Sequence, residues 1–477
     1  MEATLTEFRK VPIVSVLIPD GSIRCSFEIW ETEMKPHHFL LSLICAAICR
    51  AACADEAAIT AKVLKHTSTN GQVCCAVILK AANLPKADRR EHFILIDTSA
   101  SQVGEHRQQA LAVLGSLLKS LPDGDRVRLF AVDLRAEPLD QGLNEAHSSA
   151  VADSIETLKF RVPLGATNME GVLRAAMGAT TDQPADIIYI GDGMSTADLI
   201  ELPELRALTS DLRKRQIPVH SFGVGPQKNM HLLGVLALQT GGLVAVDSQR
   251  MIADDKAAKS AKTKSGKLAD DIKRINRSAE ERATEQGKSL ATAIAAPIYF
   301  PKELRTSPET IALLPDELLP LRMDRETIYL LRGELPDDAR LNFTGSDGKT
   351  LECKLPVAIE QPGATFLPVM TGQLETTRGL TNPLAGMILF NIAQSDFSDN
   401  ITAMAQRGVE LLQLGDIEQA TKTSETANEA EPNNETAKIL KKTLEHLKAN
   451  PPATPAATTP KKGVIDVKPI TPPKKSK

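Results

Sequence analysis

The sequence runs from the apolar segment Phe93-Ile94-Leu95-Ile96 directly into Asp97-Thr98-Ser99-Ala100-Ser101. A short, fully apolar run of this kind is typical of a buried strand in a parallel sheet. Loops that leave the carboxyl ends of such strands are where open α/β sheets bind ligands. Asp97, Ser99 and Ser101 offer three hard oxygen donors on this loop, a set that suits Mg²⁺, Mn²⁺ or Ca²⁺. The cluster contains neither Cys nor His, so we expect a cation other than zinc or copper.

Two later segments extend this pattern. Gly165-Ala166-Thr167-Asn168-Met169 opens a predicted helix over Met169–Ala179. Ile187-Ile188-Tyr189-Ile190 reads as a second buried strand, and Gly191-Asp192-Gly193 follows it. In this order and context, five side chains resemble the metal-ion-dependent adhesion site of a von Willebrand factor type A domain: Asp97, Ser99, Ser101, Thr167 and Asp192.

The resemblance covers about residues 91–250 and implies a doubly wound, mostly parallel α/β sheet. In that family the two serines and the threonine offer hydroxyls to Mg²⁺, Mn²⁺ or Ca²⁺, and the two aspartates bind directly or through water. A carboxylate from a protein partner often supplies the last ligand. This sequence departs from the family at Ala100, where many members have glycine. Because alanine adds only a methyl group, we expect metal binding to survive.

Each of these residues also has an ordinary structural role open to it. Asp97 could merely end a strand, and Ser101 could cap the helix that follows. Thr167-x-x-Glu170 fits a capping box, and Asp192-Gly193 fits a plain turn. Because all of them stand together at the ends of the appropriate elements, we favour the metal site.

The remainder of this segment alternates predicted strands and helices, as a doubly wound sheet requires. The predicted helices lie near Gly104–Leu121, Ser148–Leu158, Met169–Ala179, Pro203–Arg215 and Met230–Gln239. The further predicted strands are Arg126–Val132, Pro218–Val224 and Leu243–Val246.

The start of the chain resembles an exported protein. Residues 34–54 combine Lys35 and two histidines, the apolar run Phe39–Ile48, and Ala52-Cys53-Ala54 before Asp55, in the manner of a secretory signal peptide. We therefore expect translation to start at Met34, so that residues 1–33 are an upstream over-extension of the gene model. We also expect the protein to be periplasmic or extracellular. The alternative is a buried helix near the N-terminus.

Strands are also predicted on both sides of the type A segment. Residues 57–64 and 72–82 precede it, and after 296 come Ala312–Leu314, Thr327–Leu331, Ala339–Phe343, Leu351–Leu355 and Phe366–Met370. Gly345-Ser346-Asp347-Gly348 predicts a hairpin turn. We expect residues 55–90 and 296–375 to form one β-sandwich-like domain, with a charged, solvated helical linker over 251–295. Cys74, Cys75 and Cys353 are expected to be small buried residues, with one bridge from Cys353 as the alternative.

The C-terminal part is predicted to be helical. Residues 401–434 resemble one tetratricopeptide unit, with small or turn residues at Gly408, Gly415 and Ala420 among others. Helices over Pro383–Ala393 and Glu435–Lys448 would flank it within 380–449, and an ordinary helical hairpin is the alternative. Residues 450–477 are rich in Pro, Thr and Lys, which predicts a disordered tail with at most weak contact to an anionic envelope surface.

Composition and motifs narrow the function. A net charge of −4 argues against a general nucleic-acid binder. The sequence shows none of the common hydrolase or metalloprotease motifs, and His92 and His106 read as surface histidines, so we predict a non-enzyme. The leading hypothesis is an exported, metal-dependent module that binds an Asp or Glu of a protein partner. The alternatives are an accessory subunit of an AAA-type ATPase or chelatase-like assembly, and a structural scaffold whose metal site is vestigial.

Overall fold

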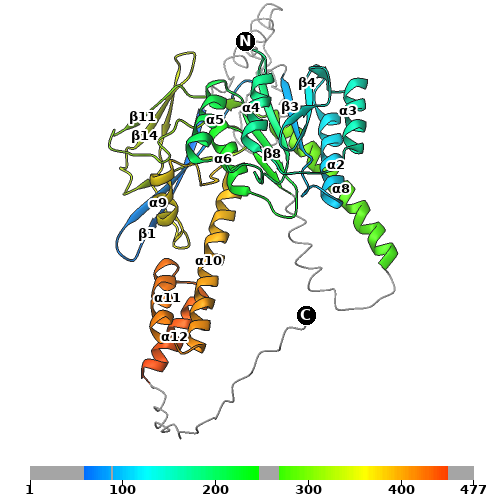
Figure 1. The fold of residues 1–477 in the computed structure, drawn as a ribbon. Helices are drawn as coiled ribbons and strands as arrows, with labels where there is room; N and C mark the ends of the chain where they lie inside the picture. Colours follow the sequence, from blue (N-terminus) through cyan, green and yellow to red (C-terminus); the bar gives the residue numbers. More distant parts are fainter. Residues whose placement is uncertain (1–57, 87–89, 247–267, 450–477) are drawn as a thin grey trace, which may run out of the picture. The chain divides into compact units, whose positions relative to one another are not determined.

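The computed structural model describes residues 58–86, 90–246 and 268–449 (Figure 1). The predicted signal peptide, the segment before it and the C-terminal tail lie outside these ranges. Each helix among the described residues is too short or too polar to cross a membrane.

The centre of residues 90–246 is a seven-stranded sheet in the order β5-β4-β3-β7-β8-β9, with β6 also paired to β4. Five of its strands, from β4 to β9 in this order, pair in parallel, and β5 and β6 pair antiparallel to β4. The strands are β3 (Glu91–Asp97), β4 (Arg126–Val132), β5 (Ala136–Pro138), β6 (Asn144–Glu145), β7 (Ala185–Gly191), β8 (Val219–Gly223) and β9 (Val244–Val246). The chain extends the sheet to opposite sides of β3, and ligand sites of open sheets lie at such a point.

Helices cover both faces of this sheet because its strands are apolar on both sides. Alternate residues of β3 point to opposite faces, so Ile94 and Ile96 belong to one core and Phe93 and Leu95 to the other. The first core is covered by α2 (Glu105–Ser120), α3 (Ser149–Phe160) and α8 (Leu268–Ile294), and the second by α4 (Met169–Ala179), α5 (Leu202–Lys214) and α6 (Met230–Thr240). The predicted doubly wound architecture is confirmed.

A second strand-rich region, formed by residues 58–82 and 298–360, flanks this sheet in the sequence. Its larger sheet has the order β13-β2-β1-β16, and its smaller ones are β11-β14-β15 and β10-β12. Strands from before residue 90 thus pair with strands from after 296, as predicted. The bounds are β1 (Ala58–Thr67), β2 (Val73–Ala82), β10 (Ile298–Tyr299), β11 (Glu303–Ser307), β12 (Leu321–Arg322), β13 (Thr327–Arg332), β14 (Arg340–Thr344), β15 (Thr350–Lys354) and β16 (Ile359–Glu360).

Residues of the two larger sheets share one core, which also contains the three described cysteines, all free and buried. This confirms the prediction that they are small buried residues. The predicted turn at 345–348 joins β14 to β15, and Gly348 has a φ of +76° there.

Two of the strand predictions in this region are wrong. Phe366–Met370 begins the helix α9 (Leu367–Thr377), which has a proline in its first turn, a position where proline is tolerated. The run 312–314 forms only an isolated bridge from Leu314 to Leu330. Short apolar runs do not distinguish a buried helix from a strand, which is why both predictions failed.

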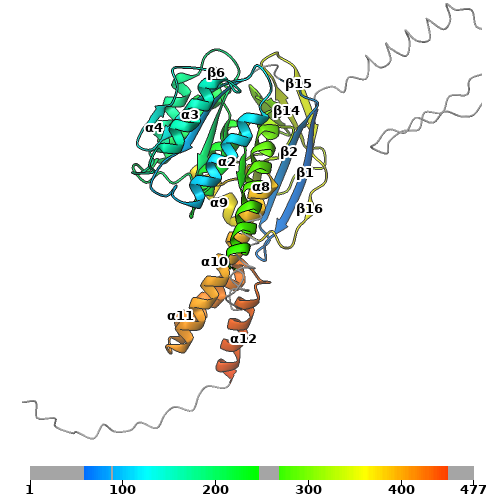
Figure 2. The same ribbon diagram turned by 90° about the vertical axis from the view of Figure 1, so that its right-hand side faces the viewer.

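The charged segment after β9 was predicted to be a solvated helix. This prediction is wrong for α8, which contributes side chains to a core. Ala283, Leu290, Ala291 and Ile294 are buried in the core that α2 also contributes to. Gly287 permits a close approach, since a β-carbon there would lie 2.5 Å from Ser116 Cβ. Figures 1 and 2 both show α8 alongside α2.

We predict that Gly287→Ala destabilises the protein by about 1–3 kcal/mol because the added methyl group meets the backbone of α2. Ordinarily, replacing glycine by alanine inside a helix stabilises it by up to about 1 kcal/mol. Gly115→Ala in α2 is the matched control, because its β-carbon would meet nothing within 4 Å. Denaturant unfolding of the full chain measures both, and a Gly287→Ala variant as stable as the wild type would contradict this packing.

Three helices end the described chain: α10 (Met387–Gln413), α11 (Ile417–Ala430) and α12 (Glu435–Ala449). The helix predicted over Pro383–Ala393 begins at Met387 and is not separate, because α10 continues to Gln413. Gly408 lies against Leu440, and Ala420 and Ala427 are buried, so the small residues of the predicted repeat do line the helix contacts. Figure 2 shows the three helices side by side.

Candidate functional site

The candidate site lies where β3 and β7 end, because their parallel pairing brings both carboxyl ends to one edge of the sheet. Asp97 is the last residue of β3, and Asp192 directly follows β7. Thr167 comes from the loop between α3 and α4. The backbone of Ala100 donates a hydrogen bond to the carbonyl of Gly165 (3.0 Å), which holds the serine and threonine loops together.

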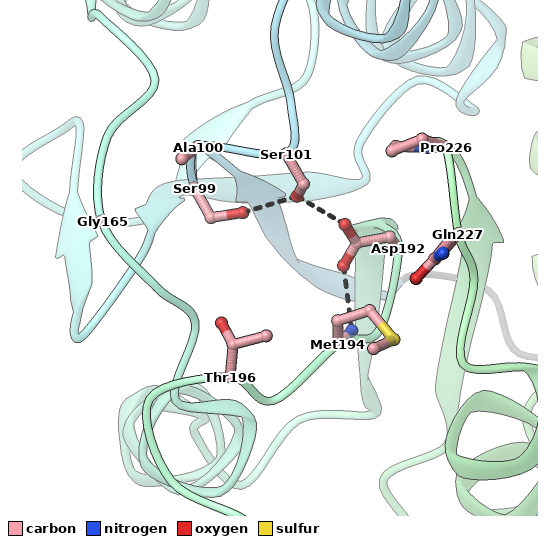
Figure 3. Close-up of a pocket in the computed structure, with 9 residues that line it drawn as sticks. All are labelled: Ser99, Ala100, Ser101, Gly165, Asp192, Met194, Thr196, Pro226 and Gln227. Atoms are coloured by element: carbon pink, nitrogen blue, oxygen red, sulfur yellow. Dashed lines mark hydrogen bonds between the residues drawn. The ribbon is translucent and has the colours of Figure 1, made fainter. Parts of the chain in front are cut away.

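All five predicted site residues belong to one hydrogen-bonded network. Ser99 Oγ lies 3.0 Å from Ser101 Oγ, which donates to Asp192 Oδ2 at 2.5 Å (Figure 3). Thr167 Oγ1 donates to Asp97 Oδ1 at 3.4 Å, and the backbone of Ser99 donates to the same oxygen at 2.8 Å.

The hydroxyls of this network are not used as helix caps. The residue that caps α4 is Asn168, whose side chain accepts from the Gly171 amide, and α2 begins at Gly104 without a side-chain cap. The turn alternative for Asp192 holds for one oxygen only, since Oδ1 accepts from the Met194 amide and Oδ2 faces Ser101.

The two carboxylates carry the electrostatic character of the site. Asp97 and Asp192 are buried, and among the described residues neither forms an ion pair with a basic side chain. Burial raises the pKa of Asp97, and the negative charge of Asp192 adds to this, against hydrogen bonds from Tyr189 and Ser99 that lower it. Two buried, unpaired carboxylates are costly, and a bound cation would relieve that cost.

The residues present fit a hard divalent cation. Adjacent oxygen ligands of octahedral Mg²⁺, each about 2.1 Å from the ion, are about 3.0 Å apart, which is the separation of the two serine hydroxyls. Throughout the described part of the chain, His, Cys, Asp and Glu do not gather in threes suited to a metal ion, and the candidate site combines only two carboxylates with three hydroxyls.

A hollow of about 410 Å³ opens on this network. Ser99, Ser101 and Asp192 line it, whereas Asp97 and Thr167 are buried beneath. Its other lining residues are Ala100, Gly165, Met194, Thr196, Pro226 and Gln227 (Figure 3). Of the three residues of the network that line it, Ser101 is partly exposed, whereas Ser99 and Asp192 are buried.

Sequence analysis missed two supporting side chains. The hydroxyl of Tyr189 donates to Asp97 Oδ2 at 2.6 Å, and Gln102 Nε2 donates to Asp192 Oδ2 at 3.2 Å. Both residues are fully buried. Tyr189 could have been noticed as the polar residue within the apolar run Ile187–Ile190, which leads to the site.

The prediction that His92 is a surface histidine is wrong, although it does lie at the opposite end of β3. It is 1% exposed, and its ring nitrogens lie 2.8 Å from Asp186 Oδ1 and 3.1 Å from Asp125 Oδ2. Burial alone would lower the pKa of His92, but the two carboxylates raise it to about 9. His106 is half-buried. The His92 cluster is thus a buried structural ion pair, remote from the candidate site.

We compared the sequence with the profiles of known protein families. Residues 91–246 match the sequence profile described as "von Willebrand factor type A domain". These residues form a type A domain. The match confirms the family that the five-residue motif predicted for this part of the chain.

Several solved structures show similarity to this chain. A von Willebrand factor type A protein from Catenulispora acidiphila is 13% identical, with 82% of this chain and 88% of that one covered and a TM-score of 0.40. The ArnB paralog VWA2 from Sulfolobus acidocaldarius is 14% identical over 81% and 93%, with a TM-score of 0.35. The manganese-loaded Plasmodium vivax TRAP protein is 17% identical over 35% and 66%, with a TM-score of 0.27.

Proposed function

We propose that this chain is an exported, non-enzymatic binding protein whose type A domain holds Mg²⁺, Mn²⁺ or Ca²⁺ and captures a carboxylate of a protein partner. The observation that carries the proposal is the pair of buried carboxylates, linked to three hydroxyls beneath an open hollow. The ligands of the ion would be Asp97, Ser99, Ser101, Thr167 and Asp192.

The charges of such a site explain why a partner carboxylate is a suitable ligand. Two carboxylates balance one divalent cation, and the hydroxyls are neutral. The cation supplies a positive point of attachment for an outside Asp or Glu. Ser99 and Ser101 line the hollow, and Tyr189 and Gln102 donate hydrogen bonds to the two aspartates.

The domain boundaries predicted from the sequence remain part of this proposal. We infer that α10–α12, with the tetratricopeptide-like spacing of 401–434, offer a second contact surface for the partner. Leu414 and Ile417, at the turn between α10 and α11, support this, because both are exposed apolar residues.

We predict that partner capture is lost in EDTA and restored by Mg²⁺ or Mn²⁺. The contact passes through the ion, so chelation should remove it, whereas moderate salt should only weaken it. The full-length protein is immobilised, incubated with an extract of its source cells, and washed in each buffer. Capture that is equal in EDTA and Mg²⁺ would place recognition away from the metal site, with α10–α12 as the next candidate.

Export is tested separately. The signal-like segment 34–54 predicts that the mature protein begins near Asp55 and is found outside the cytoplasm. N-terminal sequencing of the native protein after cell fractionation gives the answer. An intact N-terminus at Met1 in the cytosol would favour the ATPase-accessory alternative.

A further inference from the structure

Exposed apolar side chains lie at the same edge of the sheet as the candidate metal site. Of the fourteen large apolar residues that are exposed in the described chain, seven lie on the loops and helix ends at this edge of the sheet. We refer to these seven as the apolar rim: Val103, Leu134, Phe160, Val162, Leu164, Leu199 and Leu202. Phe160 is 85% exposed and Leu199 is 77% exposed.

Backbone and side-chain contacts fix this rim to the site. The amide of Leu164 donates to the carbonyl of Thr98 at 3.0 Å, within the serine loop. Arg161, between Phe160 and Val162, pairs with Asp133 beside Leu134. The loop that carries Leu199 is held by a hydrogen bond from the Ala197 amide to the carbonyl of Thr167 (3.1 Å).

The rim restricts what can bind there. A cluster of exposed apolar side chains marks an interaction surface, because leaving it in water forgoes burial energy. A carboxylate on the metal would contact only the centre of this surface. The ligand that fits is an Asp or Glu with large apolar residues directly beside it.

The chain itself contains such a segment. Residues 450–477 hold a single acidic residue, Asp466, within Val464-Ile465-Asp466-Val467. Six lysines make the rest of this tail basic. The loop after β7 offers charge complementarity, since its Asp198 and Glu201 are exposed and follow the site residue Asp192.

We propose that Val464–Val467 is a ligand of the type A domain, with Asp466 supplying the carboxylate and the flanking apolar side chains covering the rim. The inference rests on the proposed function. Asp466 comes seventeen positions after Ala449, the end of α12, and this stretch spans up to about 55–60 Å when extended. The tail would therefore occupy the site until an outside partner displaces it, or would join one copy of the chain to another.

The test uses a fluorescent peptide of residues 460–470 and the full-length chain. Asp466→Asn in the chain removes its own competing carboxylate. We expect the peptide to bind this variant in Mg²⁺ and not in EDTA, and a peptide with Asp466→Asn to lose binding. Val162→Ser with Leu164→Ser should weaken binding about tenfold, whereas Val357→Ser, an equally exposed apolar site of the strand-rich region, should not.

The wild-type chain shows whether the tail reaches its own site. A tethered ligand acts at about millimolar concentration, so for a peptide Kd near 0.1 mM the wild type should bind the peptide about tenfold more weakly than Asp466→Asn. Equal Mg²⁺-dependent binding by both chains would mean that the tail serves a second copy.

Calorimetry with Mg²⁺ alone separates the two proposals. If the chain binds Mg²⁺ but not the peptide, or binds the Asp466→Asn peptide equally well, the tail proposal is overturned and the metal site stands. If Mg²⁺ itself does not bind, the proposed function fails and the tail proposal fails with it.

Discussion

Replacing Asp97 by alanine should lower the affinity of the full-length protein for Mg²⁺ by at least about 100-fold, which corresponds to about 2.7 kcal/mol. The substitution removes one of the two buried carboxylates that would balance the ion. Asp192→Ala should have a similar effect. Ser99→Ala and Thr167→Ala remove neutral ligands and should cost about tenfold, a loss comparable to that of outer-shell partners. Isothermal titration calorimetry measures the ranking.

Two controls accompany this series. Ala100→Gly should leave Mg²⁺ affinity nearly unchanged, because residue 100 contributes no polar side-chain atom. The fold should persist in Asp97→Ala, since removing one of two neighbouring carboxylates also relieves their repulsion in the metal-free protein. Circular dichroism checks the fold, and equal Mg²⁺ affinity of the wild type and Asp97→Ala would refute the assignment.

The second large effect concerns the opposite end of the sheet, where Asp186→Ala should destabilise the protein by about 3–5 kcal/mol. Asp186 is fully buried and pairs with His92 (2.8 Å) and Arg90 (3.3 Å). Removing one partner of a buried ion pair leaves uncompensated charge in the interior. Asp211→Ala is the control, because its contact with Arg174 is a half-exposed surface pair at 3.8 Å and should change stability by less than about 1 kcal/mol.

The same cluster predicts a pH dependence. The pKa of His92 is raised to about 9 in the folded state from an ordinary value near 6.5, so its contribution is complete below pH 6.5 and is lost as pH rises through 9. For Asp186, burial raises the pKa but His92 and Arg90 lower it more, to about 2, so its contribution disappears only as pH falls toward 2. Unfolding free energy of the wild type should therefore fall by up to about 3 kcal/mol between pH 6.5 and 9.5.

Urea unfolding between pH 6.5 and 9.5 tests the contribution of His92. In Asp186→Ala the pKa of His92 should return toward its ordinary value, so the decline above pH 6.5 should become much smaller. An alkaline decline that is the same in wild type and Asp186→Ala would show that other groups cause it.

The sequence predicted the type A domain well because its signals are local. Strands β3 and β7 contain the apolar runs Phe93–Ile96 and Ile187–Ile190, and the residues of the motif end or follow β3, follow β7 or precede α4. Chain order and parallel pairing then bring these residues to one edge without further information. Tyr189 and Gln102 were missed because their roles depend on which atoms lie opposite them, and sequence spacing does not encode that.

The failures elsewhere arise from long-range packing. His92 was taken for a surface residue because its partners Asp125 and Asp186 are distant in the sequence. Helix α8 has a charged composition, but Gly287 and a few apolar residues suffice to dock it on α2. Helix α9 was predicted as a strand because of its apolar run. Its Pro368 is compatible with the first turn of a helix, but the apolar run alone did not indicate a helix.

The most direct test of the metal site is a crystal structure of the full-length protein grown in Mn²⁺, with anomalous diffraction data collected at the manganese edge. Our account predicts one strong anomalous peak within bonding distance of Ser99 Oγ and Ser101 Oγ, beside Asp97, Thr167 and Asp192, and no such peak in Asp97→Ala. A well-ordered loop without manganese, or a peak that persists in Asp97→Ala, would contradict it.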